Sequence, residues 1–466
     1  MVLAAGEGKR MRSGRPKILH LLGGQPLVRY PVALVREAGI AGTVVVVPPD
    51  ATGVHTALAD LGVRFVEQPE PRGTGDALRR ARPAVPAGAT ELLLLYADVP
   101  LLGAQTLAAL LGRHRASHAA ATVLTFVPTD PTGYGRIRRG RDGRVRAIVE
   151  ERDATPAERR GRECNSGIYC FDPERLWPAL EAIARHAPAN AQGEVYLTDV
   201  IRQLARGGCR IESVRVTDPL EVAGVNDRRQ LATLEARLRT RTLDAAMAAG
   251  VTIVDPAATY VDTTVAIGRD TVLHPGVRLA GRTTVGEGCV IGTGCQVTDT
   301  TLGDRVTLRP YCVLDEARVE ADAVLGPFAR LRRGTRVEQG ADIGNFIEIK
   351  QATIGRRVKA HHVGYIGDAT VGEGANIGAG VITCNYDGVQ KHQTHIGARA
   401  FVGTNVSLVA PITIGADAYV GAGSVITQDV PEGALAMERA PQVVKEGWTG
   451  RRRGGPKGAG GPDAAP

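Results

Sequence analysis

The segment IGARAF-VGTNVS-LVAPIT-IGADAY-VGAGSV-ITQDVP, residues 396–431, repeats an aliphatic residue at every sixth position. Six earlier blocks, VDTTVA, IGRDTV, LHPGVR, LAGRTT, VGEGCV and IGTGCQ, show the same rhythm from Val261 onward, and Ile366, Val371 and Ile377 keep a weaker version between the two runs. A six-residue period fits neither an α-helix nor an ordinary hairpin. It predicts short strands separated by tight corners, stacked as the coils of a parallel β-helix with one continuous aliphatic core. A flexible Gly-rich linker would lack this register.

The composition is that of a folded protein with two or three cores. The chain has 466 residues, of which 43% are hydrophobic, 4% are aromatic and 58 are glycines. Narrow β-helix coils would account for the glycines, because their corners require tight turns. The seven cysteines show no C-x-x-C spacing, which indicates reduced core residues rather than disulfides or zinc ligands. No apolar run approaches the length of a membrane span and no export signal is visible, so we expect a cytoplasmic protein.

The charge balance favours small anionic substrates. A net charge of +8 suits nucleotides and sugar phosphates, although part of it lies in the C-terminal sequence RRRGGPKGAGGPDAAP. We expect residues 441–466 to be a largely disordered tail. Nucleic acid is a weaker alternative partner, because no basic and aromatic recognition module supports it.

Residues 1–225 follow a different pattern. The strand-like runs 43–48, 91–98 and 121–127 alternate with helical stretches at 27–38 and 105–116. This alternation predicts a mostly parallel, Rossmann-like α/β sheet, with ligands at the carboxyl ends of its strands. Between the two regions, residues 226–249 place leucines at helical spacing. We expect them to form a helical linker that joins the two domains; the alternative is an ordinary amphipathic helix packed on the first domain. The remaining span, 250–440, is the β-helix domain.

Two strand ends in the first region carry candidate chemistry. In VLAAGEGKRM, Gly6 and Gly8 would let the backbone approach a phosphate, and Arg10 with Lys17 would neutralise a triphosphate. Asp98 ends a buried apolar strand and is a candidate Mg²⁺ ligand. Taken singly, these residues could be a plain turn, a solvated basic face and a helix cap. Their occurrence together favours a nucleotide site.

Several further stretches complete a resemblance to a known family. LAAGEGKRM followed by PK resembles the signature of sugar-phosphate nucleotidylyltransferases. EQPEPRGTGDAL, PTGYGRI, IVEERDAT, CNSGIY, AQGEVYLTD and GVNDR match it in order. Joined to a hexapeptide-repeat domain, the chain resembles the bifunctional enzymes of UDP-N-acetylglucosamine synthesis over nearly its whole length, the tail excepted. The resemblance implies a left-handed β-helix, a homotrimer with acetyltransferase sites between subunits, and two activities.

The resemblance implies an order of reactions and a uridylyltransferase site. Glucosamine-1-phosphate is N-acetylated first, and the product then attacks the α-phosphorus of UTP and releases pyrophosphate. The UDP-N-acetylglucosamine formed would supply the synthesis of peptidoglycan, lipopolysaccharide and other envelope polymers. Arg10 and Lys17 are catalytic, and Asp98 and Asn226 hold Mg²⁺. Gln68, Gly73 and Thr74 read the uracil. The full set of implied nucleotide and sugar contacts is Leu3, Ala4, Ala5, Gly6, Lys17, Gln68, Gly73, Thr74, Tyr96, Ala97, Asp98, Gly135, Glu150, Asn165 and Asn226.

The acetyltransferase site is implied in the interrupted middle of the hexad region. The stretch from Cys384 to His395 is predicted to leave the coil as an inserted loop, and such loops on rigid scaffolds commonly belong to sites. A histidine is suited to take the proton that acetyl transfer releases. The resemblance assigns His362 as the base and Arg332 and Lys350 to the phosphate. It places Tyr365, Asn376, Asn385 and Tyr386 around the sugar. The implied acetyl-CoA site consists of Ala379, Thr404, Ala422 and Arg439, and Asn385 and Tyr386 also belong to it.

The chain departs from the family pattern at four points. His361 stands where a small residue is usual, Ala97 where glycine is usual, and Lys9 where threonine is usual. Only Met1 and Val2 precede LAAG, so we expect the first strand to be short and the native start to lie upstream. Two other functions stay open: a monofunctional nucleotidylyltransferase with a structural β-helix, and a non-enzymatic sugar-nucleotide sensor. The first is disfavoured by the set Arg332, Lys350, His362 and Asn385. The second is disfavoured by Asp98 with Asn226.

Overall fold

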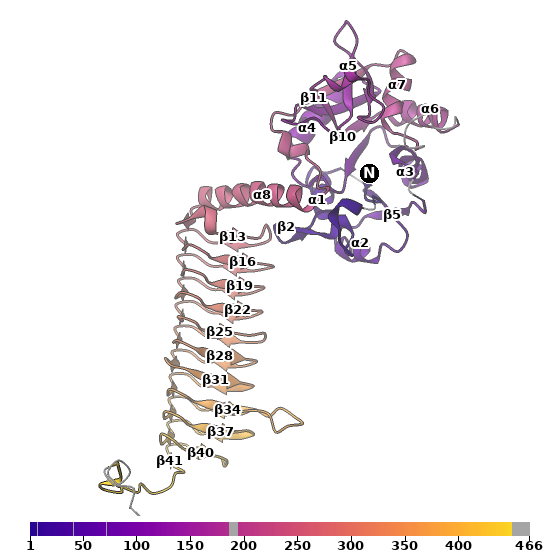
Figure 1. Ribbon diagram of the computed structural model, residues 1–466. Helices are drawn as coiled ribbons and strands as arrows, with labels where there is room; N and C mark the ends of the chain where they lie inside the picture. Colours follow the sequence, from indigo (N-terminus) through magenta and orange to yellow (C-terminus); the bar gives the residue numbers. More distant parts are fainter. Residues whose placement is uncertain (7, 41, 71, 186–193, 450–466) are drawn as a thin grey trace, which may run out of the picture. The chain divides into compact units, whose positions relative to one another are not determined.

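The chain folds into two compact units. The computed structural model describes residues 1–6, 8–40, 42–70, 72–185 and 194–449. One unit comprises Met1–Val265 with Leu279–Gly281, and the other comprises Ala266–Arg278 and the chain from Arg282 onward. Figure 1 shows an α/β arrangement in the first and a stack of short strands in the second. Among the described residues, no helix is long and apolar enough to cross a membrane. Most of the predicted tail, residues 450–466, lies outside the described residues.

A mixed sheet forms the centre of the first unit. Its strands run in the order β11-β7-β10-β6-β1-β4-β5. The pairs β1–β4, β1–β6, β4–β5 and β7–β11 are parallel, and β10 runs antiparallel to its neighbours. The strands are β1 (Val2–Leu3), β4 (Val44–Val47), β5 (Arg64–Glu67), β6 (Leu92–Tyr96), β7 (Ala121–Phe126), β10 (Cys164–Phe171) and β11 (Ile211–Arg215), with an antiparallel ribbon of β8 (Arg136–Arg139) and β9 (Val145–Val149) and a hairpin of β2 (Leu21–Leu22) and β3 (Gln25–Pro26).

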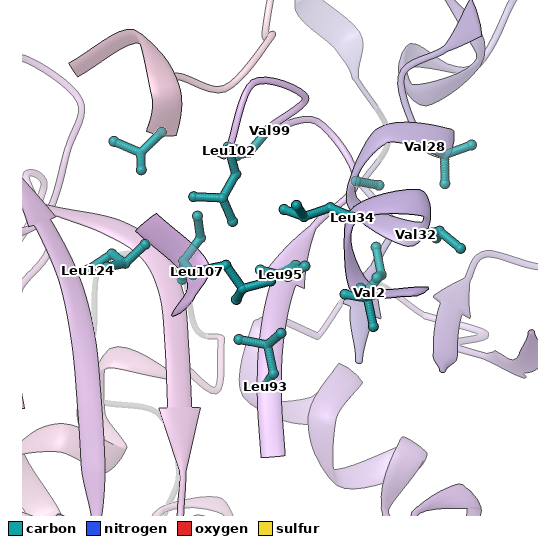
Figure 2. Close-up of a cluster of buried hydrophobic side chains, with 14 of the residues drawn as sticks. Val2, Val28, Val32, Leu34, Leu93, Leu95, Val99, Leu102, Leu107 and Leu124 are labelled. Carbon is teal, nitrogen blue, oxygen red and sulfur yellow. The ribbon is translucent and has the colours of Figure 1, made fainter. Parts of the chain in front are cut away.

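Helices cover this sheet and close its core. They are α1 (Arg29–Glu37), α2 (Thr52–Ala57), α3 (Thr74–Ala81), α4 (Ala104–Ser117), α5 (Pro156–Arg159), α6 (Pro173–Ala184) and α7 (Thr198–Arg206). Figure 2 shows one of the buried clusters, in which Val32 of α1 and Leu107 of α4 lie with Leu95 of β6. Burying such side chains stabilises the fold by about 1.5–3 kcal/mol each. The predicted strands at 43–48, 91–98 and 121–127 and the predicted helices at 27–38 and 105–116 are therefore confirmed as β4, β6, β7, α1 and α4.

The amino terminus is buried beside the central strands. The Met1 ammonium donates a hydrogen bond of 2.7 Å to the carbonyl of Leu93, and burial lowers the pKa of this amine to about 5. As expected, β1 is short, with Val2 paired to Val45 on one side and to Leu95 on the other. The strand thus brings a titratable group into an apolar core, where its charged form is disfavoured.

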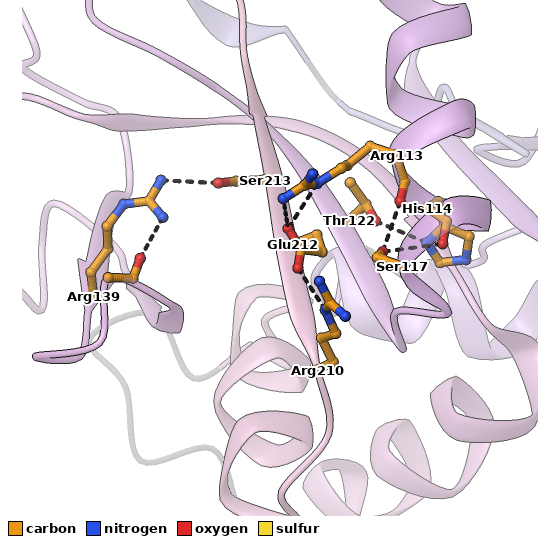
Figure 3. A network of polar contacts seen from close by, with 9 residues as sticks. Arg113, His114, Ser117, Thr122, Arg139, Arg210, Glu212 and Ser213 are labelled. Carbon is orange, nitrogen blue, oxygen red and sulfur yellow. Dashed lines mark hydrogen bonds and ion pairs between the residues drawn. The ribbon is translucent and has the colours of Figure 1, made fainter.

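Polar contacts fasten the edge strand β11, as Figure 3 shows. Glu212 accepts hydrogen bonds from Arg113 of α4 at 2.9 Å and from Arg210 at 2.7 Å. Next to it, Arg139 donates to Ser213 at 3.0 Å. These contacts join the edge strand to α4 and to the β8–β9 ribbon.

The helix predicted at 226–249 is α8 (Arg228–Ala248). Its Leu234 is buried with Leu22, Leu27 and Leu101 of the first unit. Its Glu235 accepts a hydrogen bond of 2.8 Å from the Gly23 amide. These contacts pack α8 on the first unit, and its role as a linker between the domains stays a prediction.

The second unit is a parallel β-helix with three faces. Along each face, a strand pairs in parallel register with the strand one coil away, as in the pair Val290–Thr307 and Ile291–Leu308. The first face holds β15 (Val272–Leu273), β18 (Val290–Ile291), β21 (Thr307–Leu308), β24 (Val324–Leu325), β27 (Asp342–Ile343), β30 (Lys359–Ala360), β33 (Asn376–Ile377), β36 (Phe401–Val402), β39 (Tyr419–Val420) and β41 (Leu435–Ala436).

The other two faces have the same construction. The second face holds β19 (Gln296–Thr298), β22 (Val313–Asp315), β25 (Arg330–Leu331), β28 (Ile347–Lys350), β31 (Gly364–Gly367), β34 (Ile382–Cys384), β37 (Ser407–Val409) and β40 (Val425–Ile426). The third holds β14 (Ala266–Ile267), β17 (Thr284–Val285), β20 (Thr301–Leu302), β23 (Arg318–Val319), β26 (Arg336–Val337), β29 (Thr353–Ile354), β32 (Ala369–Val371), β35 (Thr394–Ile396) and β38 (Ile412–Ile414). The remaining short strands are β12 (Thr252–Ile253), β13 (Tyr260–Val261) and β16 (Arg278–Ala280).

The hexad aliphatics fill the core of this unit, as the sequence predicts. Val402, Leu408, Ile414 and Val420 are completely buried, and each begins one of the quoted blocks. All seven cysteines of the chain are free thiols, which confirms their interpretation as reduced residues. The predicted β-helix is thus confirmed, and its rigid faces carry the second group of candidate site residues.

Candidate active sites

A pocket of about 310 Å³ opens at the carboxyl ends of β1 and β6. The loop after β1 and the start of α3 line it, together with side chains that follow β5 and β6. Its lining residues are Leu3, Ala4, Ala5, Gly6, Lys17, Ile18, Gln68, Gly73, Thr74, Ala77, Tyr96, Asp98 and Glu194. Parallel α/β sheets bind their ligands at the carboxyl ends of their strands, which is where this pocket lies. The structure therefore brings together ten of the predicted nucleotide contacts.

The polar end of the pocket gathers two cations and two oxygen ligands. Lys17 forms an ion pair with Asp98 through its Nζ, which also lies 3.4 Å from Oδ1 of Asn226. The Arg10 guanidinium donates to the same Oδ1 at 2.9 Å. Gly8 makes this possible because it has a φ of 63°, and a Cβ there would lie 2.6 Å from the Cβ of Lys17. Segments 216 residues apart thus converge on one cationic centre.

The oxygens of Asp98 and Asn226 fit a divalent cation. One ammonium contacts both of them, which shows that the two side chains point at a common place that a cation can occupy. Among the described residues, no group of three or more His, Cys, Asp or Glu side chains could hold a metal. A carboxylate and an amide oxygen are nevertheless sufficient for Mg²⁺, which takes one or two carboxylates and completes its shell with phosphate oxygens and water.

A second group of predicted residues meets around Glu150. Glu150 accepts a hydrogen bond of 3.0 Å from Thr198, and burial raises the pKa of this carboxyl. A Cβ on Gly135 would lie 3.5 Å from Oε2 of Glu150, and the carbonyl of Gly135 accepts from the amide of Asn165 at 2.9 Å. Burial and the charge of Glu150 raise the pKa of Tyr96, so its hydroxyl is neutral. Gly135, Glu150 and Asn165 are therefore neighbours.

Ala97 is placed differently from the other predicted contacts. Its side chain is 1% exposed and packs in the hydrophobic core, while its amide donates to the carbonyl of Leu3 at 3.0 Å. Tyr96 and Asp98 face the pocket because side chains alternate along a strand. The methyl group of Ala97 therefore does not line the pocket, and the departure from glycine leaves the carboxylate of Asp98 in place.

On the β-helix, one group of predicted residues clusters on the second face. The amide of Asn385 donates to the carboxylate of Asp368 and lies 3.4 Å from the hydroxyl of Tyr365. Close contact with the charge of Lys350 lowers the pKa of Lys391. Two ammonium groups this close would repel each other, so the pair is suited to an anion between them. Arg332, on the same face, is paired with Glu348 at 2.8 Å.

The two adjacent histidines lie in different surroundings. Nε2 of His361 lies 3.0 Å from Oδ2 of Asp342 in the preceding coil, whereas His362 makes no hydrogen bond or ion pair with any described residue. Both are exposed, because residues 361–363 lie between β30 and β31 rather than in a strand. Strand alternation therefore does not direct the two imidazoles to opposite sides of the coil. The difference between the rings comes from the partner of His361.

The predicted loop from Cys384 to His395 leaves the coil after β34, as Figure 1 shows. It is closed by an antiparallel bridge between Tyr386 and Lys391. At its tip, Asp387 accepts hydrogen bonds from the amides of Val389 and Gln390 and from His392, which lower the pKa of the Asp387 carboxyl. The side chain of Tyr386 is exposed. The loop is thus an ordered hairpin that holds Lys391 beside Lys350.

The predicted acetyl-CoA residues form a second, separate group. The carbonyl of Ala379 accepts a hydrogen bond of 2.7 Å from the amide of Asn405, and the carbonyl of Thr404 accepts one of 2.8 Å from the amide of Gly423. The carbonyl of Ala422 accepts one of 3.2 Å from the Arg439 guanidinium. These contacts place them on one corner of successive coils. Asn376 lies near by on β33 of the first face. Within the described part of the chain, no hydrogen bond or ion pair joins this group to Lys350, Tyr365 or Asn385.

Four contributing residues were not predicted from the sequence. Ile18, Ala77 and Glu194 line the nucleotide pocket, and Lys391 contacts Lys350. Lys391 stands within the inserted loop, so the prediction that this loop belongs to a site could have included its only lysine. Ile18 and Ala77 are apolar neighbours of predicted contacts, and nothing in the sequence distinguishes them from core residues.

Comparison with known proteins matches both units. Residues 1–205 match the MobA-like NTP transferase domain, and residues 264–299 and 393–428 match the bacterial transferase hexapeptide, a model of six repeats. The chain is 46% identical to the Bifunctional protein GlmU of Heliobacterium modesticaldum over 455 residues, which cover 98% of each chain. The chain belongs to the GlmU family. It is 45% identical to the GlmU protein of Geotalea uraniireducens over 96% of this chain and 98% of the relative.

The GlmU protein of Brevibacillus brevis is also similar, with 47% identity over 96% of this chain and 95% of the relative. Membership of the GlmU family confirms the family predicted from the sequence. It also confirms the fold, a nucleotidyltransferase domain followed by a left-handed β-helix, and the prediction of a bifunctional transferase with nucleotidyltransferase and acyltransferase activities. Membership of this family favours the bifunctional enzyme over the two alternatives considered above, a single activity and a sensor without activity.

Proposed function

We propose that this chain makes UDP-N-acetylglucosamine for envelope polymers in two steps, one on each unit. The β-helix domain, residues 250–440, transfers the acetyl group of acetyl-CoA to glucosamine-1-phosphate. The α/β domain, residues 1–225, then couples the product to UTP. The convergence of Arg10, Lys17, Asp98 and Asn226 at one end of a nucleotide-sized pocket is the observation that carries the proposal. We place both reactions in the cytoplasm, where the nucleotide and the thioester are available.

In uridylyl transfer, an oxygen of the sugar phosphate attacks the α-phosphorus of UTP, and the bond to pyrophosphate breaks. The chain supplies no nucleophile. Arg10 and Lys17 stabilise the negative charge on the phosphorus oxygens, and Gly6 lets the backbone approach the triphosphate. Mg²⁺, held by Asp98 and Asn226, would neutralise charge on the departing pyrophosphate when bound. Gln68, Gly73 and Thr74 hold the base, while Gly135, Glu150 and Asn165 bind the sugar, so the reacting atoms are brought into line.

In acetyl transfer, the sugar amine attacks the thioester carbonyl, the bond from carbon to sulfur breaks, and coenzyme A leaves as its thiolate. His362 accepts the proton that the amine loses. It is suited to this role because no described residue forms a hydrogen bond or ion pair with its ring, whereas His361 is engaged by Asp342. Arg332, Lys350 and Lys391 bind the sugar phosphate, and Tyr365, Asn376, Asn385 and Tyr386 surround the sugar. Ala379, Thr404, Ala422 and Arg439 hold acetyl-CoA.

The separation of the two β-helix groups supports a site shared between copies of the chain. Within one chain, Lys350 and Tyr365 lie on the second face, whereas Ala379, Thr404 and Ala422 lie on another corner. A cyclic trimer would place the corner of one β-helix beside the second face of the next. Light scattering of the full chain should then give three copies. A monomer with full acetyltransferase activity would contradict the shared site.

One assay tests the proposal as a whole. Purified protein is incubated with glucosamine-1-phosphate, acetyl-CoA, UTP and Mg²⁺, and the release of coenzyme A, pyrophosphate and UDP-N-acetylglucosamine is followed. We expect all three products, with uridylyl transfer lost when the metal is chelated and acetyl transfer retained. A protein that forms only one of the two expected bonds would contradict the assignment of one reaction to each unit.

A further inference from the structure

Asp76, a buried acid to which no role has been assigned, contacts the side chain proposed to read the base. Asp76 lies in the first turn of α3 and is 2% exposed. Its Oδ2 accepts a hydrogen bond of 3.1 Å from Nε2 of Gln68, which is itself 6% exposed and lines the pocket. The same Nε2 donates to the carbonyl of Gly73 at 3.2 Å. Both N–H bonds of the amide are therefore directed away from a ligand.

The charge of Asp76 is fixed by two arginines of the same helix. Arg80 donates to Oδ2 at 2.9 Å and Arg79 donates to Oδ1 at 3.2 Å. With these donors, the carboxyl is ionised and its pKa is lowered, so that it is only an acceptor. If the amide of Gln68 were turned over, its Oε1 would face the Asp76 carboxylate and the Gly73 carbonyl. Two contacts between acceptors would replace two hydrogen bonds, and such buried, unmade bonds are costly.

The fixed orientation leaves a single hydrogen-bonding atom for a ligand. Oε1 of Gln68 accepts no hydrogen bond from the described residues, and an amide oxygen has two lone pairs. A base that presents an imide N–H, as uracil does at N3, can donate to this oxygen. Cytosine in the same position presents the lone pair of its N3 to Oε1 and is repelled. An amide free to turn would accept either base by exchanging its oxygen for its NH₂ group.

We infer that Asp76 is the positioning residue that makes this nucleotide site select a uracil base over cytosine. It does so without touching the base, by fixing which end of the Gln68 amide faces the pocket. The inference rests on the proposed function, because it takes the pocket to hold the base of UTP. A purely structural role is the competing explanation, since an acid in the first turn also stabilises a helix. The test therefore needs a readout of base selection and not of activity alone.

The experiment compares kcat/KM for UTP with kcat/KM for CTP in D76N, Q68L and the double variant. The side-chain amide introduced by D76N can present either an oxygen or an NH₂ group to Gln68, so the charged one of the two acceptors that fix the Gln68 amide is lost and only the Gly73 carbonyl still favours the original orientation. We expect the ratio of UTP to CTP to fall about 10-fold in D76N, the size of one well-placed base contact. In Q68L we expect it to fall at least as far, and D76N should have no further effect on the ratio in that background. Thermal unfolding verifies that each variant is folded.

Each outcome has a separate meaning. An unchanged ratio in folded D76N, with equal losses for both nucleotides, would overturn the inference and leave a structural role for Asp76. An unchanged ratio in Q68L would instead contradict the proposed base site itself. A further fall of the ratio when D76N is added to Q68L would show that Asp76 does not act through Gln68. If D76N does not fold, D76S, whose hydroxyl both donates and accepts, replaces it with the same expectations.

Discussion

The α/β unit and the β-helix hold their candidate residues in different ways. In the first, Arg10, Lys17, Asp98 and Asn226 come from distant parts of the sequence and contact one another within one chain. In the second, the residues are close in sequence but lie in two groups on different parts of the coil. A mostly parallel sheet gathers side chains, because the carboxyl ends of its parallel strands meet at one edge. A solenoid spreads them along its faces, so the proposed acetyl-transfer site draws on a second copy.

The first prediction concerns the base on the β-helix. His362→Ala should lower acetyl transfer about 10²- to 10⁴-fold, the usual cost of losing a general base. His361→Ala is the matched control: it removes an imidazole that Asp342 already engages, and its effect should be small. Rates across pH distinguish the two. If H361A lost acetyl transfer and H362A retained it, the assignment would be reversed. If both variants retained acetyl transfer, another group or solvent would take the proton.

The second prediction addresses the shared site directly. Lys350→Ala and Arg439→Ala each damage one of the two groups, so each variant alone should be inactive in acetyl transfer. When the two are co-expressed, every mixed trimer should contain one undamaged site, and about a quarter of the normal activity should return if the chains mix at random in a cyclic assembly. Lys17→Ala with Asn226→Ala is the control pair on the α/β unit. Because that site is complete within one chain, mixing should restore no uridylyl transfer.

Restoration of both activities, or of neither, would remove the contrast between the two units. The measurement needs only differently tagged chains and the two assays, with wild-type chains carrying the same tags as the reference.

The smallest expected effect is on the stability of the α/β unit. Burial lowers the pKa of the Met1 amine from 8.0 to about 5, so the unfolded chain binds this proton more tightly than the folded chain. Folding stability should therefore rise as the pH increases from about 5 to 8, by up to about 4 kcal/mol from this group. Below pH 5 the charged amine is buried at full cost, and above pH 8 the penalty is absent.

Adding two strand-forming residues before Met1 replaces the amine by an amide, which does not titrate but still donates to Leu93. The extended chain should have a higher thermal unfolding midpoint at pH 5 and a weaker dependence on pH. Equal pH dependence in both chains would show that other groups determine it.

Sequence reasoning succeeded where a regular period or a strand end fixed the geometry. The hexad register placed Val402, Leu408 and Ile414 in the core, because one residue in six must face inward in such a coil. Asp98 could be predicted because it directly follows a buried apolar strand. Asn226 came from the resemblance, since no local pattern shows that it shares a contact with Lys17, 209 residues away.

The failures have physical causes as well. Strand alternation did not apply to His361 and His362, because the coil turns at residues 361–363. The pairing of His361 with Asp342 depends on the stacking of coils, and the lengths of the coils vary. The contact between Asp76 and Gln68 joins a helix to the end of a strand, and only the packed structure shows that the acid faces the amide rather than solvent.

The most direct test of two independent sites is one preparation of the Asp98→Ala variant measured in both assays. Loss of a metal carboxylate should abolish uridylyl transfer, and acetyl transfer should continue at the wild-type rate, because Asp98 lies in the α/β unit and the acetyl site is assigned to the β-helix. Circular dichroism and light scattering establish that the variant is folded and assembled. If both activities collapse together in such a protein, the account of two separate sites is contradicted.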